Sequence, residues 1–241
     1  MIAVLVEPGI IKVGALLSLD ASELHHLEVR RAASGDQVQL MDGRGTVGQG
    51  TVSLGKKEAR VEVHEARRVE PAARLILGVG AGDRERFGWL VEKCAELGVS
   101  EIVPLMTERS ANVASRVRTE HIEKLGRRGL EAIKQSGNPY APVLRDPIGL
   151  SQFARNTQTE VRLVAEQGAA EVGAVDPNAA VTALIGPEGG WTDEEATMLG
   201  RAGFQPVRLG AFTLRFETAA VAAVILVNLA RGGNRPGAPP F

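Results

Sequence analysis

The sequence predicts an α/β fold in which a small β-rich domain precedes a larger domain built on a parallel sheet. Residues 1 to about 70 form short strand-length runs, separated by glycine-rich turns, around one helical segment, and Ala59–Glu65 alternates with period two. From Arg74 onward, apolar strand-length runs alternate with helical segments, a pattern typical of a parallel sheet covered on both faces. We therefore expect a small β-barrel over residues 1–70 and an α/β domain over residues 74–241.

The elements predicted for the first domain surround one capped helix. Asp20 is the expected N-cap, with Glu23 three residues later, and Gly35 is expected to close the helix. The strands expected after this helix are Gln37–Met41, Thr46–Leu54 and Ala59–Glu65. Glycine-containing turns separate them, and Pro71 marks the expected boundary with the second domain.

In the second domain, strands alternate with helices that end at glycines. The expected strands are Arg74–Gly80, Glu101–Met106, Val161–Ala165, Val181–Ile185 and Pro206–Leu209. The expected helices are Asp83–Leu97, Thr119–Ser136, Thr192–Ala202 and Phe216–Arg231. Thr192 and Glu195 form a capping box, and Gly98 and Gly203 follow two of the helices where a left-handed residue is favoured.

The last of these helices is apolar on almost every side. Such a helix must be covered on every side, so it is either central and buried or packed against a second subunit. Its longest apolar run, Ala219–Val227, is far shorter than the ~20 residues that a membrane span needs. The N-terminus lacks the basic and apolar regions of a signal peptide. We expect a cytoplasmic protein with no membrane partner.

Charge and cysteine usage exclude several classes of protein. Among 241 residues, 28 are Lys or Arg and 29 are Asp or Glu, so the net charge of −1 disfavours a protein that binds nucleic acid by total charge. The one cysteine and the spacing of the four histidines predict neither a disulfide nor a metal site. The basic residues are uneven, however: residues 104–145 hold 8 basic and 4 acidic side chains, which is modest evidence for phosphate contacts.

Two segments pass from a strand through a glycine-containing loop into a helix. The first contains three glycines between Ile185 and Trp191, and it matches neither nucleotide-binding glycine motif. The second contains Arg215 and Glu217 at the start of the most apolar helix, where a site role and a structural ion pair or helix cap are equally consistent with the sequence. Because both loops follow strand ends, we expect them to form one small-molecule pocket.

These two segments carry a resemblance to a known family. The run 185–190, with sequence IGPEGG, followed by LG at 209–210 and LRFETA at 214–219, resembles the RsmE-type ribosomal RNA uracil-N3 methyltransferases of the SPOUT superfamily. The resemblance extends through ELGV at 96–99, Arg109-Ser110, and Gln135-Ser136 to His26-Leu27 near the N-terminus. It implies a PUA-like β-barrel, a SPOUT domain with a trefoil knot, S-adenosylmethionine as cofactor, 16S ribosomal RNA of the small subunit as partner, and a homodimer.

The resemblance also implies roles for individual residues. The expected cofactor-binding residues are Val164, Ala165, Glu166, Leu184, Ile185, Gly186, Pro187, Glu188, Gly189, Gly190, Leu209, Gly210, Leu214 and Thr218. The expected catalytic residues are Arg215, to orient the uracil or a phosphate, and Glu217, as a base. The expected RNA contacts are Arg30, Arg31, Arg109, Arg116, Arg118, Arg127, Arg128 and Gln135. No metal is required, because the sulfonium of the cofactor is already a strong electrophile.

Two other functions stay open at this point. A SPOUT enzyme could instead methylate a ribose 2′-hydroxyl, and a non-catalytic assembly factor could bind RNA without the cofactor. Mapping of the modified position separates the first alternative from base methylation, and a cofactor titration separates the second.

Overall fold

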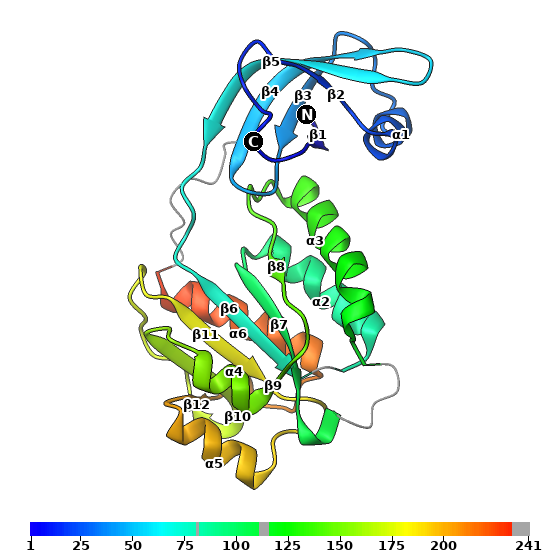
Figure 1. The fold of residues 1–241 in the computed structure, drawn as a ribbon. Coiled ribbons are helices and arrows are strands. Elements are labelled where there is room, and N and C mark those ends of the chain that lie inside the picture. Colours follow the sequence, from blue (N-terminus) through cyan, green and yellow to red (C-terminus); the bar gives the residue numbers. More distant parts are fainter. Residues whose placement is uncertain (81, 111–115, 233–241) are drawn as a thin grey trace. The chain divides into compact units, whose positions relative to one another are not determined.

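The computed structural model describes residues 1–80, 82–110 and 116–232, so the last residues of the domain predicted over 74–241 lie outside the description. The described chain divides into two compact units (Figure 1). Among the described residues, the first unit joins Met1–Pro71 to Leu130–Ala141, and the second contains Ala72–Gly129 and residues 142–232.

The first unit is built on a mixed five-stranded sheet. Its strands are β1 (Ile2–Leu5), β2 (Leu16–Ser18), β3 (Gln37–Met41), β4 (Thr46–Leu54) and β5 (Ala59–Arg68), in the order β1-β3-β4-β5-β2. Strand β1 runs parallel to β3, and the other neighbours are antiparallel. The predicted bounds of β3 and β4 are confirmed, whereas β5 continues three residues beyond the predicted Glu65. Alternate residues of these strands, such as Val61 and Val63, point into a common apolar core.

Helix α1 (Ala21–Val29) begins as predicted but ends earlier. The Asp20 carboxylate accepts a hydrogen bond from the backbone N–H of Glu23 at 2.9 Å, which confirms the N-cap. The prediction that Gly35 closes the helix is wrong, because Arg31 already adopts a left-handed conformation with φ 57°. The N–H of Ala32 then donates to the carbonyl of Leu27 at 2.9 Å and satisfies a carbonyl of the last turn.

The segment Leu130–Ala141 is tied to the first unit by its own hydrogen bonds. The Tyr140 hydroxyl donates to the carbonyl of Val69 at 2.6 Å, and the N–H of Gly45 donates to the carbonyl of Pro139 at 2.9 Å. A Cβ at Gly45 would overlap the phenol ring of Tyr140, so only glycine fits this turn.

A buried ion pair joins the same segment to α1. Helix α3 (Ile122–Ser136) places the Lys134 ammonium 2.9 Å from Oε1 of Glu23, with the two side chains only 7% and 4% exposed. Glu131 lies 2.7 Å from the same ammonium. Burial alone lowers the pKa of Lys134, but its hydrogen bonds to Glu131 and Glu23 outweigh burial, so the pKa is raised above its ordinary value.

The imidazole of His26 should make the first unit less stable in acid. Partial burial and the nearby Lys134 ammonium lower the pKa of His26 below 6.5. The unfolded chain then takes up this proton more readily than the folded protein, so stability is full above pH 6.5 and falls as pH drops through the folded-state pKa. Denaturant titrations over this range should show a weaker pH dependence for His26→Gln than for the wild type. His25→Gln, at a side chain that is 76% exposed, is the matched control, and equal slopes for all three proteins would contradict the prediction.

The second unit is built on a parallel sheet, as predicted. Its strands are β6 (Leu75–Gly80), β7 (Glu101–Met106), β8 (Val143–Leu144), β9 (Ile148–Gly149), β10 (Val161–Ala170), β11 (Val181–Ile185) and β12 (Gln205–Val207). The order is β12-β10-β11-β6-β7-β8, β9 also pairs with β7, and every pairing is parallel. The central strands β6 and β11 are fully buried, which explains their almost wholly apolar sequences.

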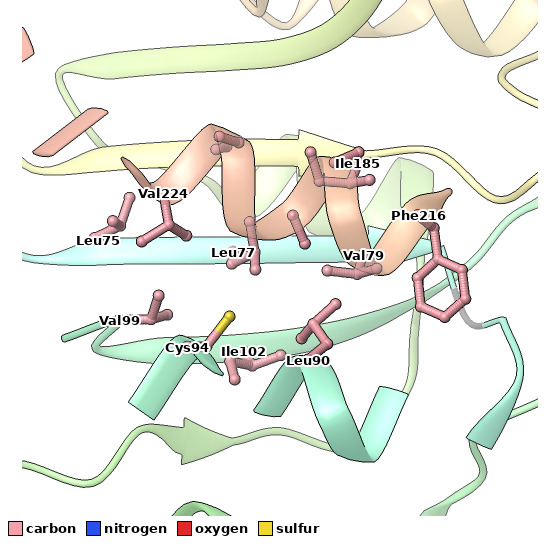
Figure 2. Close-up of a cluster of buried hydrophobic side chains, with 14 of the residues drawn as sticks. Leu75, Leu77, Val79, Leu90, Cys94, Val99, Ile102, Ile185, Phe216 and Val224 are labelled. Atoms are coloured by element: carbon pink, nitrogen blue, oxygen red, sulfur yellow. The ribbon is translucent and has the colours of Figure 1, made fainter. Parts of the chain in front are cut away.

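Helices cover both faces of this sheet. Helices α2 (Arg84–Glu96) and α6 (Phe216–Ala230) pack on one face, and α4 (Leu150–Asn156) and α5 (Asp193–Arg201) pack on the other. In β6, Leu75 and Leu77 point toward α2 and α6, whereas Ile76 belongs to the opposite core. Figure 2 shows Leu75 and Leu77 among the side chains of α2 and α6, including Cys94 and Val224. Burial without any polar partner keeps the thiol of Cys94 protonated and raises its pKa.

The ends of the predicted helices are mostly confirmed. Asp83 caps α2 through bonds from two backbone N–H groups, and Thr192 caps α5 with the reciprocal Glu195 contact. Three short elements, β8, β9 and α4, were not predicted, and a 3₁₀ turn at Thr119–His121 replaces the first turn of the long helix predicted there.

Within the described residues, no helix is both long and apolar enough to cross a bilayer. The trefoil knot implied by the resemblance stays a prediction.

Candidate cofactor and RNA site

The second unit contains a cavity of about 300 Å³ at the carboxyl ends of β10, β11 and β12. Both glycine-containing loops line it: the segment after β11 and the segment between β12 and α6. Ten of the expected cofactor residues lie in its wall, namely Ala165, Glu166, Ile185, Gly186, Pro187, Glu188, Gly190, Leu209, Gly210 and Leu214. The structure therefore brings the two loops together at the strand ends, where open α/β sheets usually bind ligands.

Four expected cofactor residues lie outside this wall. Val164 and Leu184 are buried in the core beneath α4 and α5, Gly189 lies beside Arg109, and Thr218 is exposed on α6. Val164 and Leu184 still matter for the cavity, because they pair with each other across β10 and β11 and immediately precede wall residues Ala165 and Ile185.

The first loop is held in shape by hydrogen bonds and by close packing. The N–H of Gly190 donates to the carbonyl of Pro187 at 2.8 Å. The φ of +73° at Gly190 is a left-handed conformation, which favours glycine because a Cβ would strain the backbone there. A guanidinium nitrogen of Arg109 donates to the carbonyl of Gly189. On the other side, a Cβ at Gly80 would lie 2.5 Å from the Pro187 nitrogen, so the end of β6 touches the loop backbone directly.

The second loop is anchored by three apolar side chains and one hydrogen bond. Leu209 and Leu214 pack against the core beneath α2 and α6, and Phe216 is buried within it. The Gln167 side chain at the end of β10 donates to the Thr213 hydroxyl at 2.9 Å. The loop backbone is thus fixed at both ends and in the middle.

The wall of the cavity is acidic. It contains the carboxylates of Glu166, Glu188 and Asp193 and the guanidinium of Arg208, which itself pairs with Glu171 at 2.8 Å. Glycines supply open backbone between these groups. An extended ligand that fills the cavity and carries positive charge on one part fits this wall. The carboxylates would attract the charge, and the open backbone would contact the rest of the ligand.

The two expected catalytic residues have different environments. Arg215 is exposed and, among the described residues, forms no ion pair with Glu217. The Glu217 side chain is only 12% exposed, and its Oε1 lies 4.0 Å from Nε of Arg86, whose other nitrogen lies 4.0 Å from Glu188. Within the part of the chain that the structure describes, Oε2 of Glu217 is buried and has no hydrogen-bond partner. Glu217 therefore carries an unused acceptor next to Phe216 of the cavity wall.

The residues expected to contact RNA are distributed over both units. Arg30, Arg31 and Gln135 are exposed in the first unit, and Arg118 is exposed in the second. Arg116 is half-buried, and its backbone forms an isolated antiparallel β-bridge with that of Asp83. Arg127 pairs with Glu123, and Arg128 pairs with Glu92 at 2.7 Å. These two pairs are surface contacts in α3 and between α3 and α2, so they hold the guanidinium groups only weakly.

Sequence reasoning missed part of the cavity wall. The missed residues are Gln167, Trp191, Thr192, Asp193, Ala196, Arg208, Phe212, Thr213, Phe216 and Ala219. Most of these residues flank the two loops. The sequence feature that could have indicated them is their position next to the loop glycines, not their residue type. Gln167 was missed because β10 was expected to end at Ala165, whereas it continues to Ala170.

Comparison with known proteins identifies the class. Residues 69–228 match the family described as RNA methyltransferase domain, and residues 19–63 match the RNA methyltransferase PUA domain. Because the first match covers most of the chain, the protein belongs to the RNA methyltransferase domain family, and it has a PUA-like N-terminal part.

Relatives over nearly the whole chain narrow the family further. The proteins named ribosomal RNA small subunit methyltransferase E from Synechocystis sp. and from Aquifex aeolicus are each 29% identical to this chain, cover 89% of it, and are themselves covered over 73% and 95% of their lengths. These relatives confirm the RsmE-type resemblance seen in the two loop motifs.

Solved structures share the architecture. The ribosomal RNA small subunit methyltransferase E of Neisseria gonorrhoeae, solved with bound S-adenosyl methionine, aligns with a TM-score of 0.85 at 27% identity over 95% of this chain and 97% of its own. A Legionella pneumophila protein solved with the cofactor SAM aligns with a TM-score of 0.84 at 30% identity over the same shares. The α/β fold is therefore that of the RsmE structures.

Proposed function

We propose that this protein transfers the methyl group of S-adenosylmethionine to N3 of a uridine in the 16S RNA of the small ribosomal subunit. The observation that carries the proposal is the acidic, glycine-lined cavity where the two loop motifs meet. Family membership and relatives named for ribosomal RNA methylation support the reaction and its substrate. The site of action would be the cytoplasm, where ribosomal subunits are assembled.

The residues of the cavity fit this cofactor. When bound, S-adenosylmethionine supplies a methyl group on a positively charged sulfur. The carboxylates of Glu166, Glu188 and Asp193 would favour its two cationic groups, and the open backbone at Gly186 and Gly210 would accept its extended shape. Val164 and Leu184 would act by holding β10 and β11 in place beneath the wall, and Gly189 by shaping the first loop.

The protein must also remove a proton from the uracil ring. The N3–H bond breaks as the new N3–carbon bond forms, so a nearby base has to take the proton. We assign this role to Glu217, because its Oε2 is buried without a hydrogen-bond partner among the described residues. Exposed Arg215, two residues away, would orient the uracil or a phosphate, and the exposed arginines of both units would contact the RNA backbone.

The activity can be tested with tritium-labelled cofactor and small subunits that lack the modification. Incorporation into 16S RNA, followed by nuclease digestion and mass analysis, is expected to give one N3-methyluridine. A methylated ribose would support the 2′-hydroxyl alternative instead. RNA binding with no calorimetric heat from S-adenosylmethionine would indicate an assembly factor, and a folded, cofactor-binding protein that transfers no label would overturn the proposal.

We further propose that the enzyme is a homodimer that pairs through the outer face of α6. Ile225 and Leu229 lie four residues apart on one side of this helix, and they are 41% and 64% exposed. Trp89 of α2, the helix that packs beside α6, is 42% exposed. Exposed apolar side chains that gather on neighbouring helices are typical of an interaction surface.

The double substitution of Ile225 and Leu229 to lysine should convert the dimer to a monomer. Two charges per subunit would face the apolar partner surface without a counter-charge, which strongly disfavours association. Light scattering on the eluted protein should show the mass halved. Val29→Lys is the matched control, since this side chain is 66% exposed on α1. A monomeric wild type, or an unchanged mass for the double variant, would contradict the dimer.

A further inference from the structure

Phe212 is the most exposed large apolar side chain among the described residues, at 81%. It lies in the loop between β12 and α6 and belongs to the wall of the cavity. A single exposed apolar side chain needs no explanation on an ordinary surface. At the mouth of a binding cavity, an exposed aromatic ring is a surface on which a flat ligand can stack.

The exposure of Phe212 does not come from a lack of space in the core. Leu209 and Leu214 of the same loop are partly buried and pack against the core, and Phe216 at the start of α6 is 2% exposed. Phe212 is 81% exposed. The fold therefore leaves one aromatic ring exposed in a loop whose other large apolar side chains pack against the core.

The chain next to Phe212 is tethered to the rest of the second unit. Thr213, the next residue, accepts a hydrogen bond from the Gln167 side chain at 2.9 Å. Leu214 beyond it is held by the core. A backbone tethered on this side presents Phe212 in a defined place, which lowers the entropic cost of stacking a ligand on it.

The chemistry of the neighbouring groups indicates what the ring would meet. The carboxylates of Glu166, Glu188 and Asp193 share the cavity wall with Phe212. Carboxylates accept hydrogen bonds from amino and imide N–H groups, and nucleobases combine such edges with flat faces. A purely anionic ligand would match neither the ring nor these acceptors.

We propose that Phe212 is a stacking platform for a nucleobase at the mouth of the cavity. The inference rests on the proposed function, since both substrates of that reaction carry such a base: the adenine of the cofactor and a base of the RNA. Stacking on an aromatic side chain tolerates any base, so Phe212 supplies affinity and orientation, while the edge contacts supply selectivity.

The test compares Phe212→Ala with Phe212→Trp, which keeps a stacking face, in two binding measurements. One is calorimetry with S-adenosylmethionine, and the other is fluorescence anisotropy with a labelled single-stranded RNA rich in uridine, in the presence of S-adenosylhomocysteine. We expect Phe212→Ala to weaken one of these affinities about tenfold or more, and Phe212→Trp to restore it. Loss in the calorimetric arm identifies the cofactor's adenine as the stacked base, and loss in the RNA arm identifies a base of the RNA.

Met106→Ala is the matched control for the loss of an exposed apolar side chain. Met106 is 51% exposed but does not line the cavity, so its replacement should change neither affinity. The stacking role is overturned if Phe212→Ala leaves both affinities unchanged, if tryptophan fails to restore the loss, or if the alanine variant changes the oligomeric state instead. Both measurements report binding, so a failure of methyl transfer alone would reject the proposed function and leave the stacking result standing.

Discussion

Replacing Gly80 by alanine is expected to abolish measurable binding of S-adenosylmethionine. The added Cβ would lie 2.5 Å from the nitrogen and 2.7 Å from Cδ of Pro187, and 3.0 Å from the carbonyl carbon of Gly186. Two of these three atoms are backbone atoms, so no side-chain rotation relieves the overlap, and the loop must move away from β6. The loop is part of the cavity wall, so its displacement removes the site itself.

Calorimetric titration measures this effect directly. We expect affinity to fall about a hundredfold or more, with overpacking costing about 1–3 kcal/mol of stability. Gly173→Ala is the matched control, because its Cβ would meet no atom within 4 Å and its φ is not left-handed. A melting curve that stays cooperative shows that lost binding is not lost folding. Wild-type affinity in the Gly80→Ala protein would contradict both the loop contact and the assigned cofactor site.

Replacing Lys134 by methionine should be the most destabilising charge removal in the first unit. It leaves the Glu23 carboxylate, only 4% exposed, without its cation. The Oε2 atom of Glu23 already lacks a hydrogen-bond partner within the described residues. Removing one partner of a buried pair typically costs about 3–5 kcal/mol, because the other charge stays buried.

The double variant Glu23→Gln with Lys134→Met should regain most of this loss, since no buried charge is left. Arg127→Met, which breaks the exposed pair with Glu123, is the control and should cost no more than about 0.5 kcal/mol.

The stability that the Lys134–Glu23 pair contributes should depend on pH. Because the folded-state pKa of Lys134 is raised, this contribution is complete below pH 10.5 and is lost as pH rises through that pKa. A single variant as stable as the wild type would contradict the role of the pair.

Local signals predicted most of the fold. Glycine-containing turns predicted β3 and β4 to the residue, and side-chain caps predicted the starts of α1 and α5, because these features depend on neighbours in sequence. The closure of α1 was misplaced since Arg31, not a glycine, takes the left-handed position. Elements as short as β8 and β9 carry too few residues for any period to be visible.

The location of the candidate site could be predicted from the sequence, but several residues of the cavity wall could not. Strand ends and glycines predicted that two loops meet, and the cavity contains both. The wall residues Trp191 and Phe212 could not be chosen, because their place depends on loop conformation. The pairing of Glu217 with Arg86 could not be predicted either, because more than a hundred residues separate them and no local sequence pattern relates the two positions.

The membership of Leu130–Ala141 in the first unit has a consequence for how the chain matures during synthesis. When Pro71 has left the ribosome, all five strands of the first sheet exist, yet Lys134 and Tyr140 have not been made. Until about seventy further residues emerge, Glu23 has no cation and the carbonyl of Val69 has no phenol donor. The N-terminal unit therefore finishes folding only after Ala72–Gly129 of the second unit has been translated, while β10, β11 and β12 of that unit are still to come.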